Sequence, residues 1–431
     1  MSHLYENDKR HTYEHELEKR LLVDWSLGRI SLEQCRELNM TVLDLDWHWL
    51  IQAALIHGIG PLICYYIEQQ PEIWQLLNAE IRHELMQIEM AAHVRHRRCV
   101  EEVSAILRSL NERNVPAVVL KGPVLSSLYP EDHLRWFTDL DLLVHERDLE
   151  LTEEALGNVG YYSEAPIAQS KPPENFTWHL PAYIKTKGSP IAVEVHGNQH
   201  AQFGHFGLVD LAEWLENAVP TTLYGIPTFT LTREDALFFL LDHIARHHSV
   251  PDGRNLKSLL DACLHIKAGV DWNKLLTNVH RFNNAEKDLV VWVEQTFYPL
   301  ASDPQAIELQ WLQFNGIANR VHYAMRCLNE IYGLVVPDFA INGTYSNVDY
   351  QQLCSLGVCN GEYGGKQRRY QWHVPYWNRV LDYPDVSSSI PDLLDSQVLE
   401  LWMEYDPLPP LWENSQRALD YWRRAPRIRP K

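Results

Sequence analysis

Two aspartates with spacing suited to metal chemistry occur in the run DLDLLV, an alternating pattern typical of a strand. Asp139 and Asp141 are two residues apart, so on a strand both side chains leave the same face, with Cα atoms roughly 7 Å apart. Hard oxygen ligands on a rigid strand suit Mg2+, which keeps several waters and usually adds substrate phosphates to one or two carboxylates. The pattern therefore predicts a site for Mg2+ (or Mn2+) at this pair.

A third carboxylate is required if a second metal is to activate an attacking hydroxyl, because two-metal sites hold their ions about 3.5 to 4 Å apart. Glu194, in the run IAVEVHG, is the best candidate, on a strand that we expect to neighbour that of Asp139. His196 lies two residues further along the same face. It either orients a ligand or caps the strand.

Two other motifs serve as comparisons for this pair. The letters DLD also occur at Asp44 to Asp46, before an aromatic helical run and with no glycine loop upstream. Residues two apart on a helix point about 200° apart, so this copy is not expected to share a metal. His243 and His247 are four apart on an expected helix and could bind a metal, but no third ligand is evident nearby.

The spacing of apolar residues along the chain predicts the helices and strands that must position these residues. Apolar residues recur at helical spacing in the first segment, whereas VPAVVLKG and FTDLDLLVHE predict two strands with a helix between them. Helical spacing then returns, before a tail rich in Gly, Pro, Trp and Tyr. The predicted fold class is α/β (α+β), a core with a short mixed sheet flanked by helical N-terminal and C-terminal domains. The expected boundaries are 1–113, 114–230, 231–335 and 336–431.

Local signals predict where some of these elements begin and end. The helix LELTEEALGNVGY is expected to end at Gly157 or Gly160. The run PAYIKTKGSPIAVEVHG predicts a hairpin with its turn at 187–189. Thr232 followed by Asp235 predicts a capping box at the start of the next helix.

The order of an apolar strand ending in LKG, a helix, the DLDLLV strand and a later strand with an inward acid resembles the nucleotidyltransferase (polymerase-beta-like) superfamily. More closely, LKGPVLSSLYPEDHLRWFTDLDLLV with the later VEVHG is similar to the loosely characterised bacterial group of nucleotidyltransferase family proteins. The resemblance covers about residues 40–280 and is strongest over 118–145.

This resemblance implies a role for each residue that matches the motif. Gly122 would let the loop backbone approach the triphosphate, and Lys121 or Arg135 would contact phosphate. The helix with His243 would form part of the wall facing the active cleft. The implied catalytic and metal-binding residues are Asp139, Asp141 and Glu194. The implied nucleotide-binding residues are Lys121, Gly122, Arg135 and His196.

The function implied is metal-dependent transfer of a nucleoside monophosphate from a nucleoside triphosphate to an acceptor hydroxyl of a small molecule or protein. Two departures from the motif leave an alternative open, a catalytically inactive nucleotide-binding or regulatory protein. Pro123 removes a backbone N–H donor from the loop, and the 15 residues between Pro123 and Asp139 exceed the usual spacing. A tRNA-modifying nucleotidyltransferase of the toxin or antitoxin type also stays open, although only the tail, from Arg423 to Lys431, offers it a basic track.

Composition limits the partners and the compartment. A formal charge of −19, from 57 acidic and 38 basic side chains, repels polyphosphate backbones, so a broad nucleic-acid surface is disfavoured while a local basic patch stays possible. Seven cysteines without a CxxC pair are typical of reduced thiols. The charged N-terminal segment is unlike a signal peptide, and no apolar run approaches the roughly 20 residues that span a bilayer. We expect a cytoplasmic protein without a membrane partner.

Overall fold

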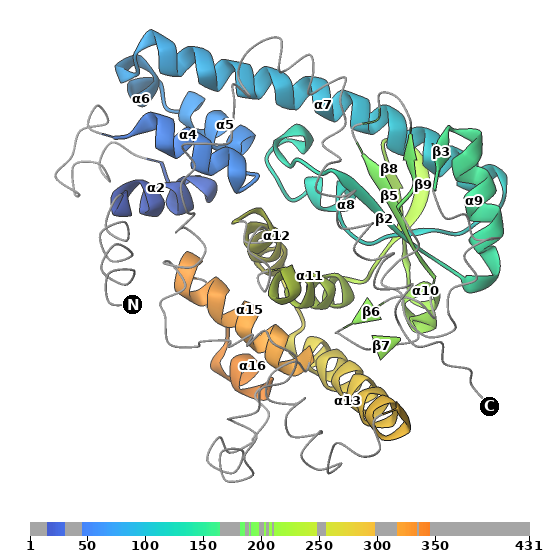
Figure 1. Cartoon of the computed structure of the whole chain (residues 1–431). Coiled ribbons are helices and arrows are strands. Elements are labelled where there is room, and N and C mark those ends of the chain that lie inside the picture. The colour runs from blue at the N-terminus through green and yellow to red at the C-terminus, as the bar shows by residue number, and fades with distance from the viewer. Residues whose placement is uncertain are drawn as a thin grey trace, which may run out of the picture.

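The computed structural model begins with a group of helices that is followed by one long helix. The residues that it describes are 15–30, 45–163, 182–185, 189, 191–197, 202–203, 207–208, 211–247, 256–297, 317–333 and 336–344. The first helices are α2 (Glu16–Ser26), α4 (Trp47–Ile56), α5 (Gly60–Glu68) and α6 (Pro71–Leu76). Helix α7 (Ala79–Glu112) then runs along the top of the molecule, from these helices to the sheet (Figure 1). Its first turn is capped by Asn78, whose Oδ1 accepts a hydrogen bond from Ile81 N at 2.8 Å.

The central sheet has five strands in the order β5-β2-β1-β9-β8 and is mixed, which confirms the predicted fold class. Strand β1 pairs antiparallel with β2 and parallel with β9, β2 pairs parallel with β5, and β8 pairs antiparallel with β9. The strands are β1 (Val118–Val119), β2 (Asp139–Val144), β5 (Ala192–Gly197), β8 (Val219–Leu223) and β9 (Ile226–Thr230). Two short pairs lie outside this sheet, β3 (Tyr161–Tyr162) with β4 (Ile184–Lys185) and β6 (Gln202–Phe203) with β7 (Gly207–Leu208).

The two faces of the sheet pack against different groups of helices. Leu140, Leu142 and Val144 of β2 belong to one hydrophobic cluster with the second half of α7 and with α9 (Leu149–Asn158). Leu143 belongs to a second cluster, which also contains the N-terminal helices and the C-terminal ones. Alternation along β2 therefore turns every second residue, including both aspartates, away from α9.

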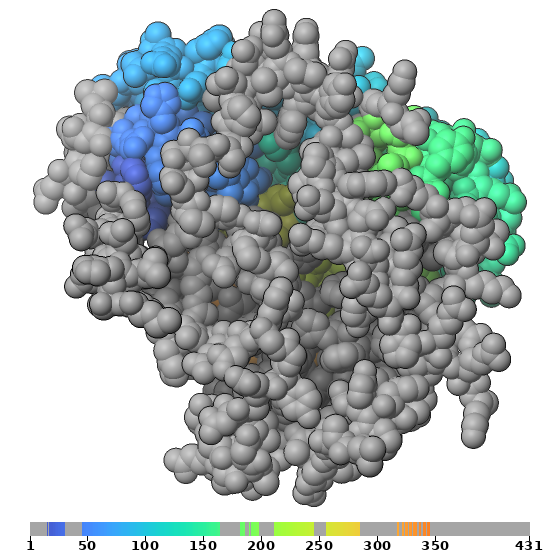
Figure 2. Space-filling model, in the orientation of Figure 1, coloured from blue at the N-terminus to red at the C-terminus, as the bar shows by residue number. Residues whose placement is uncertain are grey.

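The C-terminal helices pack on one another and complete the second cluster. Their bounds are α11 (Arg233–His247), α12 (Leu256–Lys267), α13 (Trp272–Phe297), α15 (Ile317–Tyr332) and α16 (Asp338–Gly343). The short elements are α8 (Pro123–Ser126), η2 (Asp132–Leu134), η3 (Glu146–Asp148) and α10 (Ala212–Glu216). In Figure 2, atoms of the α11 and α12 segment are visible between the blue N-terminal helices and the green segment at the edge of the sheet. No helix among the described residues is both long and apolar enough to cross a membrane.

The local predictions have different outcomes. Helix α9 ends at Asn158, between the two candidate glycines, and Asp235 N donates to Thr232 Oγ1 at 3.3 Å as the predicted capping box requires. Tyr183 and Val193 form the antiparallel bridge of the predicted hairpin, but β4 pairs with β3, and most of the predicted turn lies outside the described residues. The basic tail lies outside them too.

His57 joins the N-terminal helices to the start of α12. It follows α4 and is 2% exposed. Its Nδ1 accepts a hydrogen bond from Leu256 N at 3.4 Å, and its carbonyl oxygen accepts one from Lys257 N at 3.1 Å. Burial lowers the pKa of His57 to about 4. The neutral ring is therefore the form that the fold stabilises.

We expect this histidine to make the protein sensitive to acid. Because the pKa of His57 in the folded protein is below the ordinary 6.5, its neutral ring adds to the free energy of unfolding. This contribution is fully present above about pH 6.5 and is lost as the pH falls towards 4. The free energy of unfolding should decrease by up to roughly 1.4 kcal/mol per pH unit in that window. In urea denaturation, His57→Asn, which keeps an acceptor for Leu256 N, should lose this dependence. The exposed-site control His48→Asn should keep it. A wild-type slope in His57→Asn would contradict the assignment.

Candidate active site

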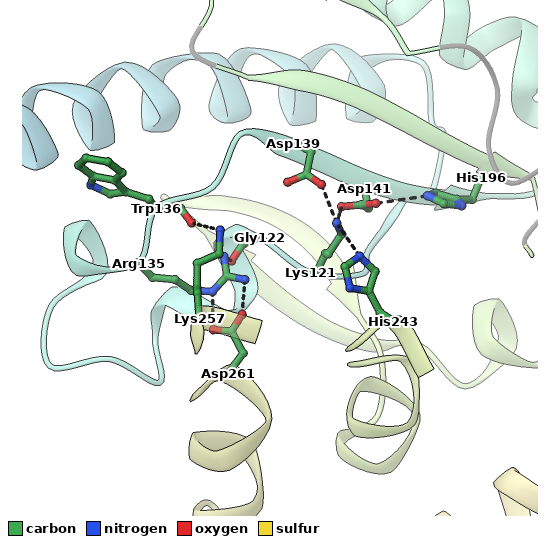
Figure 3. Close-up of polar contacts among 10 residues, drawn as sticks. All are labelled: Lys121, Gly122, Arg135, Trp136, Asp139, Asp141, His196, His243, Lys257 and Asp261. Atoms are coloured by element: carbon green, nitrogen blue, oxygen red, sulfur yellow. Dashed lines mark hydrogen bonds and ion pairs between the residues drawn. The ribbon is translucent and has the colours of Figure 1, made fainter. Parts of the chain in front are cut away.

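The carboxylates of the predicted site lie on two adjacent parallel strands. Asp141 of β2 is in register with Glu194 of β5, and Asp139 lies two residues before Asp141 on the same face. Asp141 is 1% exposed, and the Asp139 side chain is 23% exposed. His196 Nε2 is 3.4 Å from Asp141 Oδ1. The structure thus brings together the three acids and the histidine that the sequence pattern singled out, and Figure 3 shows Asp139, Asp141 and His196 among them.

Lys121 compensates the negative charge of this group. Its Nζ is 2.6 Å from Asp139 Oδ2 and 3.3 Å from Asp141 Oδ2. Burial alone would lower the pKa of Lys121, but the carboxylates of Asp139, Asp141 and Glu194 outweigh it and raise that pKa. Burial would also raise the pKa of Asp139, yet the Lys121 ammonium holds it well below its usual range. Both groups are therefore charged at neutral pH.

His243 of α11 lies on the far side of the same ammonium group. Its Nε2 is 3.4 Å from Lys121 Nζ, and Figure 3 shows its ring approaching the lysine from the helix opposite β2. Helix α11 therefore lines the carboxylate face of the sheet, as the resemblance implied. The side chain of His247 lies outside the described residues, so the i, i+4 histidine pair is not tested.

The donor atoms around Asp141 suit a divalent cation. Asp141 Oδ2 is buried and accepts no hydrogen bond among the described residues, although the Lys121 ammonium is close. One ligand atom each from Asp141, Glu194 and His196 lies within 4.8 Å of the others. Two carboxylates and an imidazole are ligands found in divalent-metal sites. Asp139 is not a member of this closest group, and its Oδ2 is hydrogen-bonded to Lys121.

Gly122 follows Lys121 in the segment between β1 and α8, and it has a conformation that favours glycine. Its φ is 72°, and a Cβ there would lie 3.2 Å from the backbone oxygen of Asp139. Its carbonyl oxygen accepts hydrogen bonds from Arg135 Nη1 at 2.9 Å and from Leu125 N at 3.2 Å. Backbone geometry therefore accounts for this glycine without a ligand.

Arg135 is held by a buried carboxylate of α12 that the sequence pattern did not single out. Its Nε and Nη2 donate to the two oxygens of Asp261 at 2.8 and 2.6 Å, and both side chains are at most 4% exposed. Tyr129 donates to the same carboxylate at 2.7 Å. The guanidinium is thus engaged by Asp261 and by the Gly122 carbonyl, in an arrangement that links the loop to α12.

Lys257 lies one turn before Asp261 and, like Asp261, was not singled out by the sequence pattern. Its Nζ donates to the Trp136 carbonyl at 3.1 Å (Figure 3). Burial, together with repulsion by Arg135, lowers the pKa of Lys257 to about 8. The sequence offered one signal for this group of residues, namely that Asp261 is an acid within the otherwise apolar helical run LKSLLDACLHI. Nothing local in that run indicates its partner.

The other DLD copy, at residues 44–46, has a different role. Asp46 caps α4, because its Oδ1 accepts a hydrogen bond from Trp49 N at 3.0 Å. Asp44 lies outside the described residues. Asp46 therefore acts as a helix cap and is followed by a helix, as its sequence context predicted.

Comparison with known proteins gives a match over the segment that holds this site. A family described as an uncharacterised nucleotidyltransferase matches residues 44–287. No curated protein and no solved structure matches the chain. The matched segment contains the strands with the three acids and the helices α11 and α12 that face them.

Removing one partner of the buried Arg135–Asp261 ion pair should destabilise the protein strongly. Asp261→Asn leaves the Arg135 charge without its carboxylate, and loss of one partner of a buried pair costs about 3 to 5 kcal/mol. Urea denaturation at neutral pH measures this change. The matched control is Glu101→Gln, which removes the exposed pair with Arg97 and should change the free energy of unfolding by less than about 1 kcal/mol. Equal effects of the two variants would contradict the role given to Asp261.

Proposed function

The chain belongs to an uncharacterised nucleotidyltransferase family, and on that premise we propose that it transfers a nucleoside monophosphate from a nucleoside triphosphate to an acceptor hydroxyl. We further propose that Mg2+ (or Mn2+) binds at Asp139, Asp141 and Glu194. The observation that carries the proposal is the in-register pairing of Asp141 with Glu194, with Asp139 on the same face. Acids at these places are poor packing residues but suitable metal ligands.

The proposed reaction requires one bond to form and one to break. The acceptor oxygen attacks the α-phosphorus, the bond from that phosphorus to the bridging oxygen of the β-phosphate breaks, and pyrophosphate leaves in line. Glu194 takes the proton of the acceptor hydroxyl. A divalent ion bound at the acids would neutralise phosphate charge and polarise the reacting oxygens. His196 positions Asp141 through its 3.4 Å contact.

The cationic residues divide into two roles in this proposal. Lys121 serves the triphosphate, because its ammonium is free to contact a phosphate oxygen once the carboxylates have another cationic partner. Gly122 keeps the loop backbone close to Asp139. Arg135 is a positioning residue, since Asp261 and the Gly122 carbonyl engage its guanidinium. This role replaces the phosphate contact that the resemblance implied.

The acceptor proposed is a small molecule or a protein side chain. A net charge of −19 opposes a long polyanion at long range. The test is incubation with each α-labelled nucleoside triphosphate, Mg2+ or Mn2+ and a cell lysate. Label should appear in the small-molecule or protein fraction. Label in the RNA fraction alone would contradict this acceptor class.

A second candidate function has one observation in its favour. The Lys121 ammonium lies against Asp139 and Asp141 and compensates their charge without a metal. A protein that binds nucleotide without transferring it could keep this arrangement permanently. The same labelling experiment separates the two functions, because such a protein would retain nucleotide that stays unchanged and would label no acceptor.

The first test of the metal assignment removes the charge of both β2 acids. Asp139→Asn combined with Asp141→Asn should weaken calorimetric binding of Mg2+ with a nucleoside triphosphate by about 100-fold or more, because two ligands lose their charge. The matched control is Asp46→Asn in the other DLD copy, where asparagine caps a helix as well as aspartate does. It should bind like the wild type. Equal binding by the wild type, the double variant and the control would contradict the assignment of the metal to Asp139 and Asp141.

The second test separates binding from turnover. Glu194→Gln should bind nucleotide but lose roughly 10²- to 10⁴-fold in the rate of single-turnover label transfer, the contribution typical of a general base. Raising the pH should restore part of the rate if a missing proton acceptor is the cause. An unimpaired rate would leave Glu194 with a structural role only.

A further inference from the structure

A second group of potential metal ligands lies on α7 and η2, apart from the carboxylates of the sheet. Glu89 and His93 are four residues apart on α7, so they share one face of that helix. His133, from η2, packs its ring on that of His93, with centroids 3.7 Å apart and planes inclined by 22°. One ligand atom from each of the three residues lies within 4.8 Å of the other two.

The two ring nitrogens of His133 have different surroundings, one beside a carboxylate and one without a partner among the described residues. Its Nδ1 is 3.4 Å from a carboxylate oxygen of Glu131, and its side chain is 6% exposed. Its Nε2 is buried and has no hydrogen-bond partner among the described residues. Histidines that bind metals usually donate one ring N–H to a carboxylate, which leaves the other nitrogen deprotonated for the metal. A buried ring nitrogen without a partner otherwise costs free energy.

From this geometry we propose that Glu89, His93 and His133 bind a divalent transition metal of the Zn2+ class. Two imidazoles and one carboxylate form a ligand set known for Zn2+, with a fourth position for water. Imidazole ligands favour Zn2+, Cu2+ and Ni2+ over Mg2+, which prefers oxygen. The His93 side chain is 52% exposed, so it can adjust to draw the three atoms to bonding distance and leaves the ion open to solvent.

The surrounding charge favours a cation at this place. Glu68 of α5 lies against the Glu89 carboxylate, so two acids repel one another at this place. A bound divalent ion would relieve that repulsion. Glu89 Oε1 already faces His93 Nε2 at 3.9 Å. The three ligand atoms thus lie close together, and the exposed His93 ring must turn to direct its nitrogen at a shared ion.

The position of the site indicates what the metal would do. His133 precedes Arg135 by two residues, and Arg135 holds the Gly122 carbonyl. An ion shared by α7 and η2 would therefore anchor the segment that carries Arg135. The proposed role is structural, and it does not depend on the proposed transfer reaction.

The test is Zn2+ binding by the full chain, measured by competition with a zinc-binding dye in excess Mg2+, which occupies the oxygen-rich site. The wild type should bind one equivalent in competition with the dye. His93→Gln and Glu89→Gln should lose that equivalent, with binding about 100-fold weaker or more. Glu131→Gln, which removes only the carboxylate beside His133, should weaken it about 10-fold. Co2+ in the wild type should give the intense visible absorption of a four- or five-coordinate ion.

The matched control is His83→Gln, an exposed histidine of the same helix that contacts Gln87. It should bind Zn2+ and Co2+ like the wild type. Circular dichroism and a thermal transition verify the fold of each variant, and the exposure of His93 makes its variant the safest in this respect. Unchanged stoichiometry and affinity in His93→Gln and Glu89→Gln, or a wild type that does not compete with the dye, would overturn the proposal.

Discussion

Negative charge gathered on one face of two adjacent strands is the constraint on which the rest of the site depends. Parallel pairing in register puts Asp141 beside Glu194, and the strand period adds Asp139. Such a group is stable in a largely buried position only if positive charge lies close by. Lys121 supplies that charge directly, and α12 adds Lys257, which lowers the pKa of Asp139 further.

A buried cation near these acids needs a carboxylate partner of its own, and Asp261 is that partner for Arg135. Arg135 is within the electrostatic reach of Asp139, and its own charge is neutralised by Asp261 of α12. This pair links the Gly122 loop to α12, and His57 links α12 to the N-terminal helices. One network of buried polar contacts thus connects the carboxylates of the sheet to helices that are distant in the sequence. Its members are costly to remove singly because each leaves a partner buried without compensation.

The sequence predicts contacts of the site between residues that are close along the chain better than contacts between residues that are far apart. Strand periodicity brings Asp139 and Asp141 onto one face, and the order of motifs leads to Glu194 on the neighbouring strand. Helix context likewise separates Asp46, a cap, from the other DLD copy. The partner of Arg135 is 126 residues away, and no spacing rule reaches across that separation. The resemblance implied that Lys121 or Arg135 contacts phosphate, and it gave no indication of the Arg135–Asp261 pair.

The loop departures acquire a physical meaning from the same contacts. Pro123 stands at the first position of α8 and offers no N–H, and Leu125 N is already bonded to the Gly122 carbonyl. The backbone of this loop therefore has fewer donors for a triphosphate than a glycine-rich cradle would have. In the proposed function, triphosphate binding would then depend more on cationic side chains that face the acids. Lys121 is the closest of these, and Lys257 is a second, held at Trp136 with its pKa lowered to about 8. On the proposed function, charge from side chains would take over part of the role that backbone amides have in a glycine-rich loop.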